Sequence, residues 1–207
     1  MLIIFDLDDT LIDTTGTIAP LALRRAFATF GRPDEEYFSF LSLNEELGSS
    51  KKAILQFAKQ VGSDPDLARI AFQEPLPKDV VVGLTPGALE ALTLLGGKHT
   101  LALVTGGEER FQLEKLKKAG LDQGLFSKIV CVEDLIKKPW FLSLHAEFGG
   151  SPRDVLVCGD RVDLDLEPAF ALGFQTAQMR WGRGLKAPPP LWVDHVIYDV
   201  RELIRII

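Results

Sequence analysis

The chain has 207 residues, of which 46% are hydrophobic, and its formal net charge is −6. This length suffices for one core or for a core with a small insertion, and this hydrophobic content argues against a disordered chain. The negative charge argues against nucleic acid as a partner, because phosphate backbones are bound mainly by clustered Lys and Arg. No basic segment with a long apolar stretch opens the chain, and no apolar run approaches about 18 residues, so we expect no membrane partner and a cytoplasmic setting.

The first predicted element is a strand at Leu2–Phe5, an apolar run that leads directly into Asp6, Asp8 and Asp9. The run shows no polar alternation, which is typical of a strand buried on both faces in a parallel sheet. A surface turn could also carry three carboxylates for solubility, but such a turn is rarely entered from so apolar a run. The sequence therefore predicts a buried strand with acidic residues gathered at its carboxyl end.

Residues 15–79 contain no run that resembles a strand. Helical segments are predicted at Pro20–Phe30, Asp34–Leu47, Ser50–Val61 and Asp66–Phe72. Gly and Pro residues separate these segments, and their apolar positions favour a small core of their own. The sequence therefore predicts an all-helical domain at 15–79, inserted into a core domain that comprises residues 1–14 and 80–207.

From residue 80 onward, strand-like and helical patterns alternate. Strands are predicted at Thr100–Val104, Lys128–Val132, Val155–Cys158, Phe174–Met179 and His195–Tyr198. Helices are predicted at Pro86–Leu95, Glu108–Ala119, Trp140–Phe148 and Leu166–Leu172. This alternation is typical of βαβ units. We therefore predict an α/β fold with a doubly wound, Rossmann-type parallel sheet, in which the first strand lies between the strands that begin at Thr100 and Val155.

Polar residues and a glycine follow the predicted strands at their carboxyl ends, where open parallel sheets bind ligands. They are Asp6 and Asp8 after the first strand, Thr105 and Gly106 after the second, Lys137 and Lys138 beyond the third, and Asp160, Asp163 and Asp165 after the fourth. Several carboxylates at one edge would repel one another unless a cation neutralised them, and oxygen ligands alone favour Mg²⁺. A carboxylate beside such a cation can attack phosphorus, and a second one can exchange protons with the leaving oxygen and with water. The pattern therefore indicates phosphate chemistry.

The motifs DLDDTL, LVTGG, KKP and GDRVDLD resemble, in order and spacing, those of the haloacid dehalogenase (HAD) superfamily, in its phosphatase branch. The resemblance covers nearly the whole chain apart from the helical insertion, and Asp9 stands where the family commonly has Gly. It implies a hydrolase that cleaves a phosphate monoester of a small metabolite through an aspartyl-phosphate, with Mg²⁺ as cofactor. It also implies that the insertion closes over the site, selects the substrate and excludes water.

The resemblance also implies a role for each motif residue. Asp6 would be the nucleophile and Asp8 the general acid and base, while Thr105, Gly106 and a lysine would bind the phosphoryl group. The Mg²⁺ ion would be held by the Asp6 carboxylate, the Asp8 backbone carbonyl and the acids of the fourth motif, Asp160 and Asp165. Asp165 fits the family's GDxxxxD pattern better than Asp163 does.

The lysine segment departs from the family pattern KPxxxF, because Lys138-Pro139 reaches Phe141 after only one residue. Pro139 favours an extended backbone at Lys138, and adjacent side chains on an extended segment point to opposite sides. The Lys-Pro dipeptide resembles the family motif. We therefore expect Lys138 to point into the site as the catalytic lysine, with Lys137 as the alternative.

Two other functions share the same residues. A phosphomutase of the β-phosphoglucomutase type has the same catalytic set and differs in its cap. A non-catalytic phosphate-binding regulatory module could use the same pocket without turnover, although the presence of every catalytic side chain disfavours it. A dehalogenase is disfavoured because its reaction does not use the second Asp of the first motif, which is present here as Asp8.

Overall fold

The computed structural model describes all 207 residues, which divide into two compact units. The first, called the α/β unit below, comprises residues 1–15 and 79–207, and the second, the helical unit, comprises residues 16–78. The sequence placed the insertion at 15–79. The longest helix, α4 (Ser50–Val61), has 12 residues, and no helix is long and apolar enough to cross a membrane.

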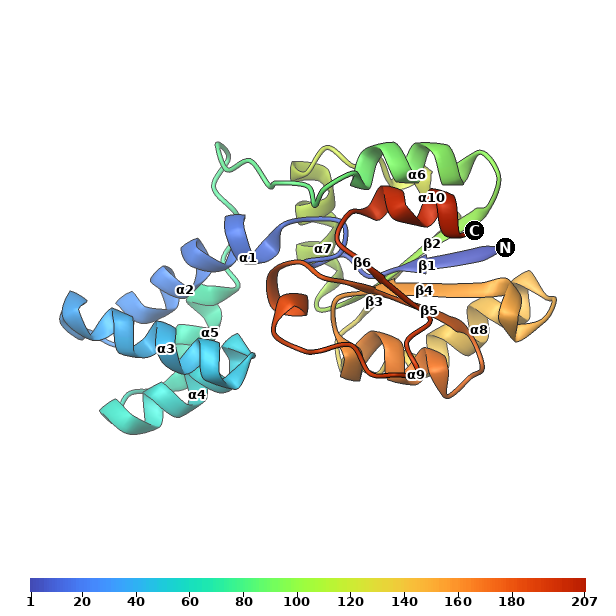
Figure 1. The fold of residues 1–207 in the computed structure, drawn as a ribbon. Helices are drawn as coiled ribbons and strands as arrows, with labels where there is room; N and C mark the ends of the chain where they lie inside the picture. The colour runs from blue at the N-terminus through green and yellow to red at the C-terminus, as the bar shows by residue number, and fades with distance from the viewer. The chain divides into compact units, whose positions relative to one another are not determined.

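The α/β unit is built on a six-stranded sheet in which all neighbouring strands are parallel (Figure 1). In chain order its strands are β1 (Leu2–Phe5), β2 (Thr100–Gly106), β3 (Lys128–Val132), β4 (Val155–Gly159), β5 (Gln175–Met179) and β6 (His195–Ile197). Their order across the sheet is β3-β2-β1-β4-β5-β6. The predicted parallel sheet is therefore confirmed, with β1 between β2 and β4.

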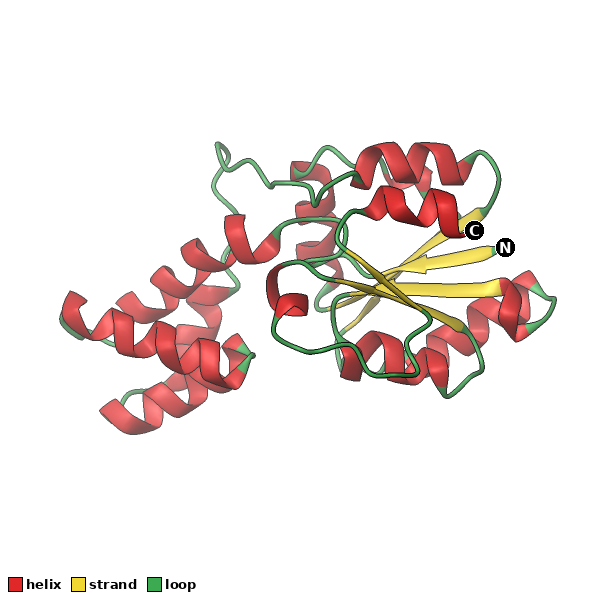
Figure 2. Ribbon diagram, in the orientation of Figure 1, coloured by secondary structure: helices red, strands yellow, loops and turns green.

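Helices cover both faces of this sheet (Figures 1 and 2). Those of the unit are α6 (Ala88–Gly96), α7 (Glu109–Lys118), α8 (Lys138–Phe148), α9 (Glu167–Phe170) and α10 (Leu203–Ile206). Figure 1 shows α6 and α10 on one face and α8 and α9 on the other. Side chains alternate along a strand, so Leu2 and Ile4 of β1 pack in one core cluster with Phe141 and Leu144 of α8.

The helical unit has a core of its own, made largely of aromatic rings. Its helices are α2 (Ala19–Ala28), α3 (Tyr37–Leu47), α4 and α5 (Pro65–Phe72), and α1 (Thr14–Thr17) spans the boundary between the units. Phe40 is fully buried, and its ring centroid lies 5.9 Å from those of Phe27 and Phe30 and 5.2 Å from that of Phe57. All buried side chains of this unit are apolar.

Polar caps precede two of these helices and glycines follow two, within one residue of the bounds that the sequence predicts. Ser49 and Asp64 accept hydrogen bonds from the first turns of α4 and α5. Gly48 and Gly62 follow α3 and α4 in the left-handed conformation that favours glycine. The predicted helix Asp34–Leu47 differs slightly, because its first turn, Asp34–Glu36, is a 3₁₀ helix that leads into α3.

Candidate active site

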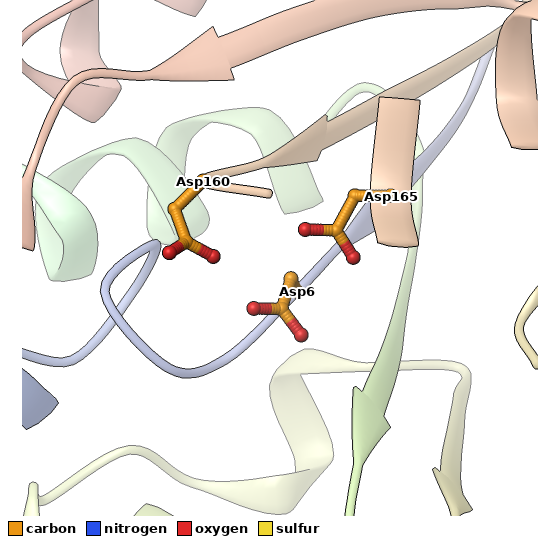
Figure 3. A group of neighbouring side chains, drawn as sticks. All are labelled: Asp6, Asp160 and Asp165. Atoms are coloured by element: carbon orange, nitrogen blue, oxygen red, sulfur yellow. The ribbon is translucent and has the colours of Figure 1, made fainter. Parts of the chain in front are cut away.

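Three buried carboxylates meet at the carboxyl edge of the sheet (Figure 3). Asp6 follows β1, Asp160 follows β4, and Asp165 lies in the single π-helical turn Val162–Leu166. One carboxylate oxygen of each lies within 4.8 Å of the others. The Asp6 amide donates to the Cys158 carbonyl at 2.9 Å, which continues the β1–β4 ladder to the first acid. The sheet therefore brings together acids that are about 150 residues apart in the chain.

Lys137 is the lysine that enters this cluster. Its Nζ lies 2.6 Å from Asp6 Oδ1 and 2.5 Å from Asp165 Oδ1, and its side chain is only 4% exposed. Lys138 is exposed. The prediction that Lys138 points inward is therefore wrong, and the alternative lysine occupies the site.

The backbone at the start of α8 explains this reversal. Lys137 caps the helix with φ −79° and ψ −24°, and its carbonyl accepts hydrogen bonds from the amides of Trp140 and Phe141. Lys138 is already the first helical residue, and Pro139 lies in the first turn, where its missing N–H is tolerated. The backbone here is helical and not extended, so successive side chains diverge by about 100°. The expectation that Lys137 and Lys138 point to opposite sides of an extended segment therefore does not apply.

The acids carry more negative charge than the neighbouring lysine offsets. Burial raises the pKa of Asp6 to about 6, with Lys137 opposing this rise and Asp165 and Asp8 adding to it. Burial also raises the pKa of Asp160 well above its ordinary value, opposed by Arg183 and reinforced by Asp6 and Asp165. Lys137 has a raised pKa because its two carboxylate partners outweigh its burial, so it stays charged.

The donor set fits a hard cation such as Mg²⁺. Both carboxylate oxygens of Asp160 are buried and accept no hydrogen bond, and Arg183 Nε lies 3.5 Å from one of them as an ion pair. A buried carboxylate without hydrogen bonds has the electron pairs that a metal ligand needs. Asp165, in contrast, accepts from Lys137 with one oxygen and from the Arg161 amide, at 3.0 Å, with the other. Asp6 and Asp160 are therefore better placed than Asp165 as direct ligands.

Asp163, the other acid of this motif, lies outside the cluster. It is exposed, and its carboxylate forms an ion pair with Arg161 at 2.9 Å. The sequence favoured Asp165 over Asp163 for the inward position, and the structure places Asp165 there.

Asp8 is held by partners of its own. Lys115 Nζ lies 2.8 Å and 2.9 Å from its two carboxylate oxygens, and Thr14 Oγ1 donates to Oδ1 at 2.5 Å. Burial raises the pKa of Asp8, but Lys115 and Arg183 outweigh burial, and the pKa lies below its ordinary value. The Asp8 backbone carbonyl lies 3.5 Å from a guanidinium nitrogen of Arg183.

Thr105 and Gly106 are the last two residues of β2 and therefore reach the same edge of the sheet. Thr105 is fully buried, and its hydroxyl donates to Gln112 Oε1 at 3.4 Å. Gln112 Nε2 in turn donates to the Gly106 carbonyl at 2.8 Å. At Gly107, with φ +133°, a Cβ would lie 2.5 Å from Gln112 Nε2, so glycine is required for this close approach.

Asp9 connects two segments that are far apart in the sequence, those of Thr15 and Arg183. Its φ is +58°, a left-handed conformation that explains why glycine suits this position, and its side chain is fully buried. The carboxylate accepts from the amide and hydroxyl of Thr15, at 2.8 and 2.6 Å, and from Arg183 Nε at 2.9 Å. Gly182 makes room for it, because a Cβ there would lie 2.4 Å from the carboxylate carbon.

Four residues that contact the site lie outside the predicted motifs: Thr14, Gln112, Lys115 and Arg183. Gln112 and Lys115 lie in the predicted helix Glu108–Ala119, where Gln112 and Leu116 are the buried residues. A polar residue on the buried side of α7 and an arginine between two glycines are the only local signals, and both are weak.

Comparison with known proteins identifies the family. The sequence matches the haloacid dehalogenase-like hydrolases over residues 3–179, which is most of the chain. The chain is a haloacid dehalogenase-like hydrolase. Among relatives of this hydrolase, a glyceraldehyde 3-phosphate phosphatase of Pyrococcus furiosus is 27% identical over 232 residues, covering 99% of this chain and 92% of the relative. A phosphoglycolate phosphatase of Aquifex aeolicus is 30% identical over 203 residues, covering 87% and 84%.

Solved structures agree with this assignment at the level of fold. The magnesium-bound HAD-hydrolase YfnB of Bacillus subtilis superposes with a TM-score of 0.75 at 22% identity, covering 99% of this chain and 97% of its own. A HAD phosphatase of Thermococcus onnurineus gives a TM-score of 0.68 at 23% identity, covering 99% and 96%. The family match over residues 3–179 confirms the membership predicted from the four motifs.

Proposed function

We propose that this hydrolase is a Mg²⁺-dependent phosphatase that hydrolyses a small phosphate monoester through an aspartyl-phosphate formed on Asp6. The observation that carries the proposal is the buried group of Asp6, Lys137 and Asp160. In it the Lys137 ammonium lies 2.6 Å from the Asp6 carboxylate, while the Asp160 carboxylate accepts no hydrogen bond. Asp6 would supply the nucleophile, Lys137 the positive charge and Asp160 a metal ligand for phosphoryl transfer to a carboxylate. The phosphatases among the relatives support the same chemistry.

In the first half-reaction, a carboxylate oxygen of Asp6 attacks phosphorus, and the bond from phosphorus to the ester oxygen breaks. Lys137, Thr105 and the backbone at Gly106 would stabilise the charge on the phosphoryl oxygens. The leaving oxygen takes a proton from Asp8. The contacts of Asp8 favour its carboxylate form, but a bound phosphate dianion beside it would raise its pKa, because a nearby like charge disfavours ionisation.

In the second half-reaction, the Asp8 carboxylate takes a proton from water, and the water oxygen attacks phosphorus. The bond from phosphorus to Asp6 breaks, which releases inorganic phosphate and regenerates the Asp6 carboxylate. The hydrogen bonds from Lys115 and Thr14 suit this step, since they hold Asp8 in the form that accepts a proton.

Three oxygen donors would hold the Mg²⁺ ion: the carboxylates of Asp6 and Asp160 and the backbone carbonyl of Asp8. When bound, the ion would offset the charge of the phosphoryl oxygens and of the acids around them. Asp165 would then orient Lys137, to which it is hydrogen-bonded, more than bind the ion directly. The magnesium bound to the related YfnB supports an ion in a protein of this fold.

The helical unit is proposed to act as the cap that selects the substrate. It is inserted between β1, which ends at the nucleophile, and β2, which ends at the phosphate-binding Thr105. The chain leaves the α/β unit through Thr14 and Thr15, whose side chains bond to Asp8 and Asp9. The cytoplasmic setting expected from the sequence stays a prediction.

A substrate panel tests the proposed function. We expect Mg²⁺-dependent release of inorganic phosphate from at least one small ester in a panel that includes glyceraldehyde 3-phosphate and phosphoglycolate. EDTA should abolish the release, added Mg²⁺ should restore it, and Ca²⁺ should be a poor substitute because it takes more ligands at longer distances. Asp6→Asn is the inactive control.

Full activity in EDTA, or turnover by Asp6→Asn near the wild-type rate, would refute the mechanism. Binding of phosphate esters without turnover would instead identify the non-catalytic module. Conversion of a sugar phosphate to its isomer without net release of phosphate would identify a phosphomutase.

A further inference from the structure

Helix α7 presents two polar side chains, Gln112 and Lys115, to the site. They are three residues apart, so they lie on one face of the helix. Gln112 is 5% exposed, and the Lys115 side chain is 12% exposed. Burying an amide and an ammonium on a helix face that packs inward is unfavourable unless both find partners.

Both side chains find their partners in the two halves of the site. Gln112 bonds to Thr105 at 3.4 Å and to the Gly106 carbonyl at 2.8 Å. Lys115 Nζ lies 3.4 Å from Gln112 Oε1, and its remaining contacts are to the Asp8 carboxylate. Helix α7 therefore connects the phosphate-binding end of β2 to Asp8 through a continuous chain of hydrogen bonds.

The contact between Lys115 and Asp8 restricts the orientation of the carboxylate. Lys115 reaches both oxygens, at 2.8 and 2.9 Å, while Thr14 bonds to Oδ1. Two contacts from one ammonium and a third from a hydroxyl leave little freedom for rotation about the last side-chain bond. A group that exchanges protons must present its oxygen within hydrogen-bond reach of the reacting atom, so a fixed orientation favours the transfer.

The pair is also unlike an ordinary stabilising contact. Both side chains are nearly buried, at 12% and 14% exposed, and a buried ion pair often stabilises a fold no better than apolar residues of the same size. The exposed Lys117 on the same helix shows that α7 can carry lysines that face solvent.

We propose that Lys115 is a positioning residue for Asp8, whose carboxylate it holds in the orientation that exchanges protons with the leaving oxygen and the attacking water. Lys115 acts only through Asp8 and touches neither phosphorus nor the leaving group. Gln112 fixes the Lys115 ammonium relative to Thr105 and Gly106. The inference rests on the proposed phosphatase function, because it assigns a helper to the acid and base of that reaction.

A double-mutant cycle tests this assignment with the full-length protein, Mg²⁺ and the best ester of the panel. Lys115→Met should lower kcat about 100-fold, the scale of a lost general acid and base, with KM within about twofold. Asp8→Asn should lower kcat at least as much, and the double variant should match Asp8→Asn, since no carboxylate remains to be positioned. Lys115→Arg should recover part of kcat, and Lys117→Met is the matched control with wild-type kcat.

Pre-steady-state kinetics with 4-nitrophenyl phosphate give a second readout. Its leaving group needs little protonation, so a misplaced Asp8 should slow mainly the attack of water. Lys115→Met should therefore release one equivalent of 4-nitrophenol in a burst before a slow steady phase. A purely structural defect would slow both phases and show no burst.

An unchanged kcat in Lys115→Met would overturn the inference. So would an equal loss from Lys115→Met in the wild-type and Asp8→Asn backgrounds, because Lys115 would then act independently of Asp8. If Met at this position prevents folding, as circular dichroism would show, Lys115→Gln takes its place and the same comparisons decide. A wild-type protein that hydrolyses no ester would instead refute the proposed function itself, whatever the variants do.

Discussion

The two units of this hydrolase bury different kinds of side chain. In the helical unit all buried side chains are apolar, with Phe27, Phe40 and Phe57 at the centre. In the α/β unit the buried set also includes charged groups, among them Asp6, Asp160 and Lys137. All buried polar or charged side chains of the protein lie in the α/β unit.

The two kinds of burial have opposite effects on the stability of the fold. Apolar burial stabilises a fold by about 25 cal/mol per Å², whereas a buried charge is unfavourable unless it is paired. In the α/β unit, Lys137 bonds to Asp6 and Asp165, and Arg183 bonds to Asp9 and forms an ion pair with Asp160. We therefore expect the two units to respond differently to substitutions and to pH.

The largest effect is expected from Lys137→Met. It removes the ammonium from two buried carboxylates, so kcat should fall by about 100-fold or more, as when a charge-stabilising group is lost. The free energy of unfolding should also fall by about 3–5 kcal/mol, because breaking a buried pair leaves a charge without a partner. Steady-state kinetics and urea unfolding measure both quantities. A variant with wild-type kcat would show that the buried ammonium has no part in the chemistry.

Phe40→Ala should destabilise the helical unit without a direct effect on the charged cluster. Truncating a fully buried Phe lowers the free energy of unfolding by about 3–5 kcal/mol. Phe38→Ala is the matched control: Phe38 lies on the same helix but is 73% exposed, so its truncation should change this free energy little. Hydrogen exchange should accelerate at amides of α2 to α4 and stay slow at those of β1. Equal acceleration in both units would show that they unfold together and do not have separate stabilities.

The largest pH dependence of stability should come from the α/β unit, where the titrating carboxyl groups are buried. Because the pKa of Asp6 is raised from 3.8 to about 6, the folded protein binds more protons than the unfolded chain between these values. The stability of the wild type relative to Asp6→Asn should therefore fall as pH rises through about 6, as measured by urea unfolding in EDTA.

Asp163 provides a control of opposite sign for that titration. Burial raises the pKa of Asp163, but the contacts with Arg161 outweigh this effect and lower the pKa below its ordinary value. The stability that this carboxylate contributes is therefore lost as pH falls. Relative to Asp163→Asn, the wild type should gain stability as pH rises. The same trend in both comparisons would contradict the assigned causes.

The smallest effect is expected from Lys138→Met. This lysine is exposed, so kcat should change by less than about threefold, as for a solvated surface charge. The variant is also the neighbour control for Lys137→Met. A large loss of kcat in Lys138→Met alone would reverse the assignment of the two lysines.

The sequence was sufficient for the sheet and for most of the site. The six apolar runs predicted the strands to within two residues at each end, because a strand buried on both faces has a continuous apolar pattern. The acids then followed from the rule that parallel strands bring their carboxyl ends to one edge. Family membership followed from four ordered motifs.

The remaining site residues depended on contacts that local patterns do not encode. Lys115 meets Asp8 across 107 positions of sequence, and Arg183 meets Asp9 across 174. The choice between Lys137 and Lys138 turned on where α8 begins, and helix boundaries are the least certain part of a prediction from sequence. Pro139 suggested an extended backbone, but at the first turn of a helix it is equally acceptable.

The aspartyl-phosphate on Asp6 can be tested directly by trapping the phosphorylated enzyme. Asp8→Asn protein, in which attack by water is slowed, is mixed with Mg²⁺ and 4-nitrophenyl phosphate, whose leaving group needs little protonation, and is then quenched in acid, digested and analysed by mass spectrometry. We predict that the peptide containing Asp6 gains the mass of one phosphoryl group and that Asp6→Asn abolishes this gain. Release of phosphate by the wild type without a phosphorylated Asp6 in the trapped variant, or a phosphoryl group on another residue, would contradict the proposed mechanism.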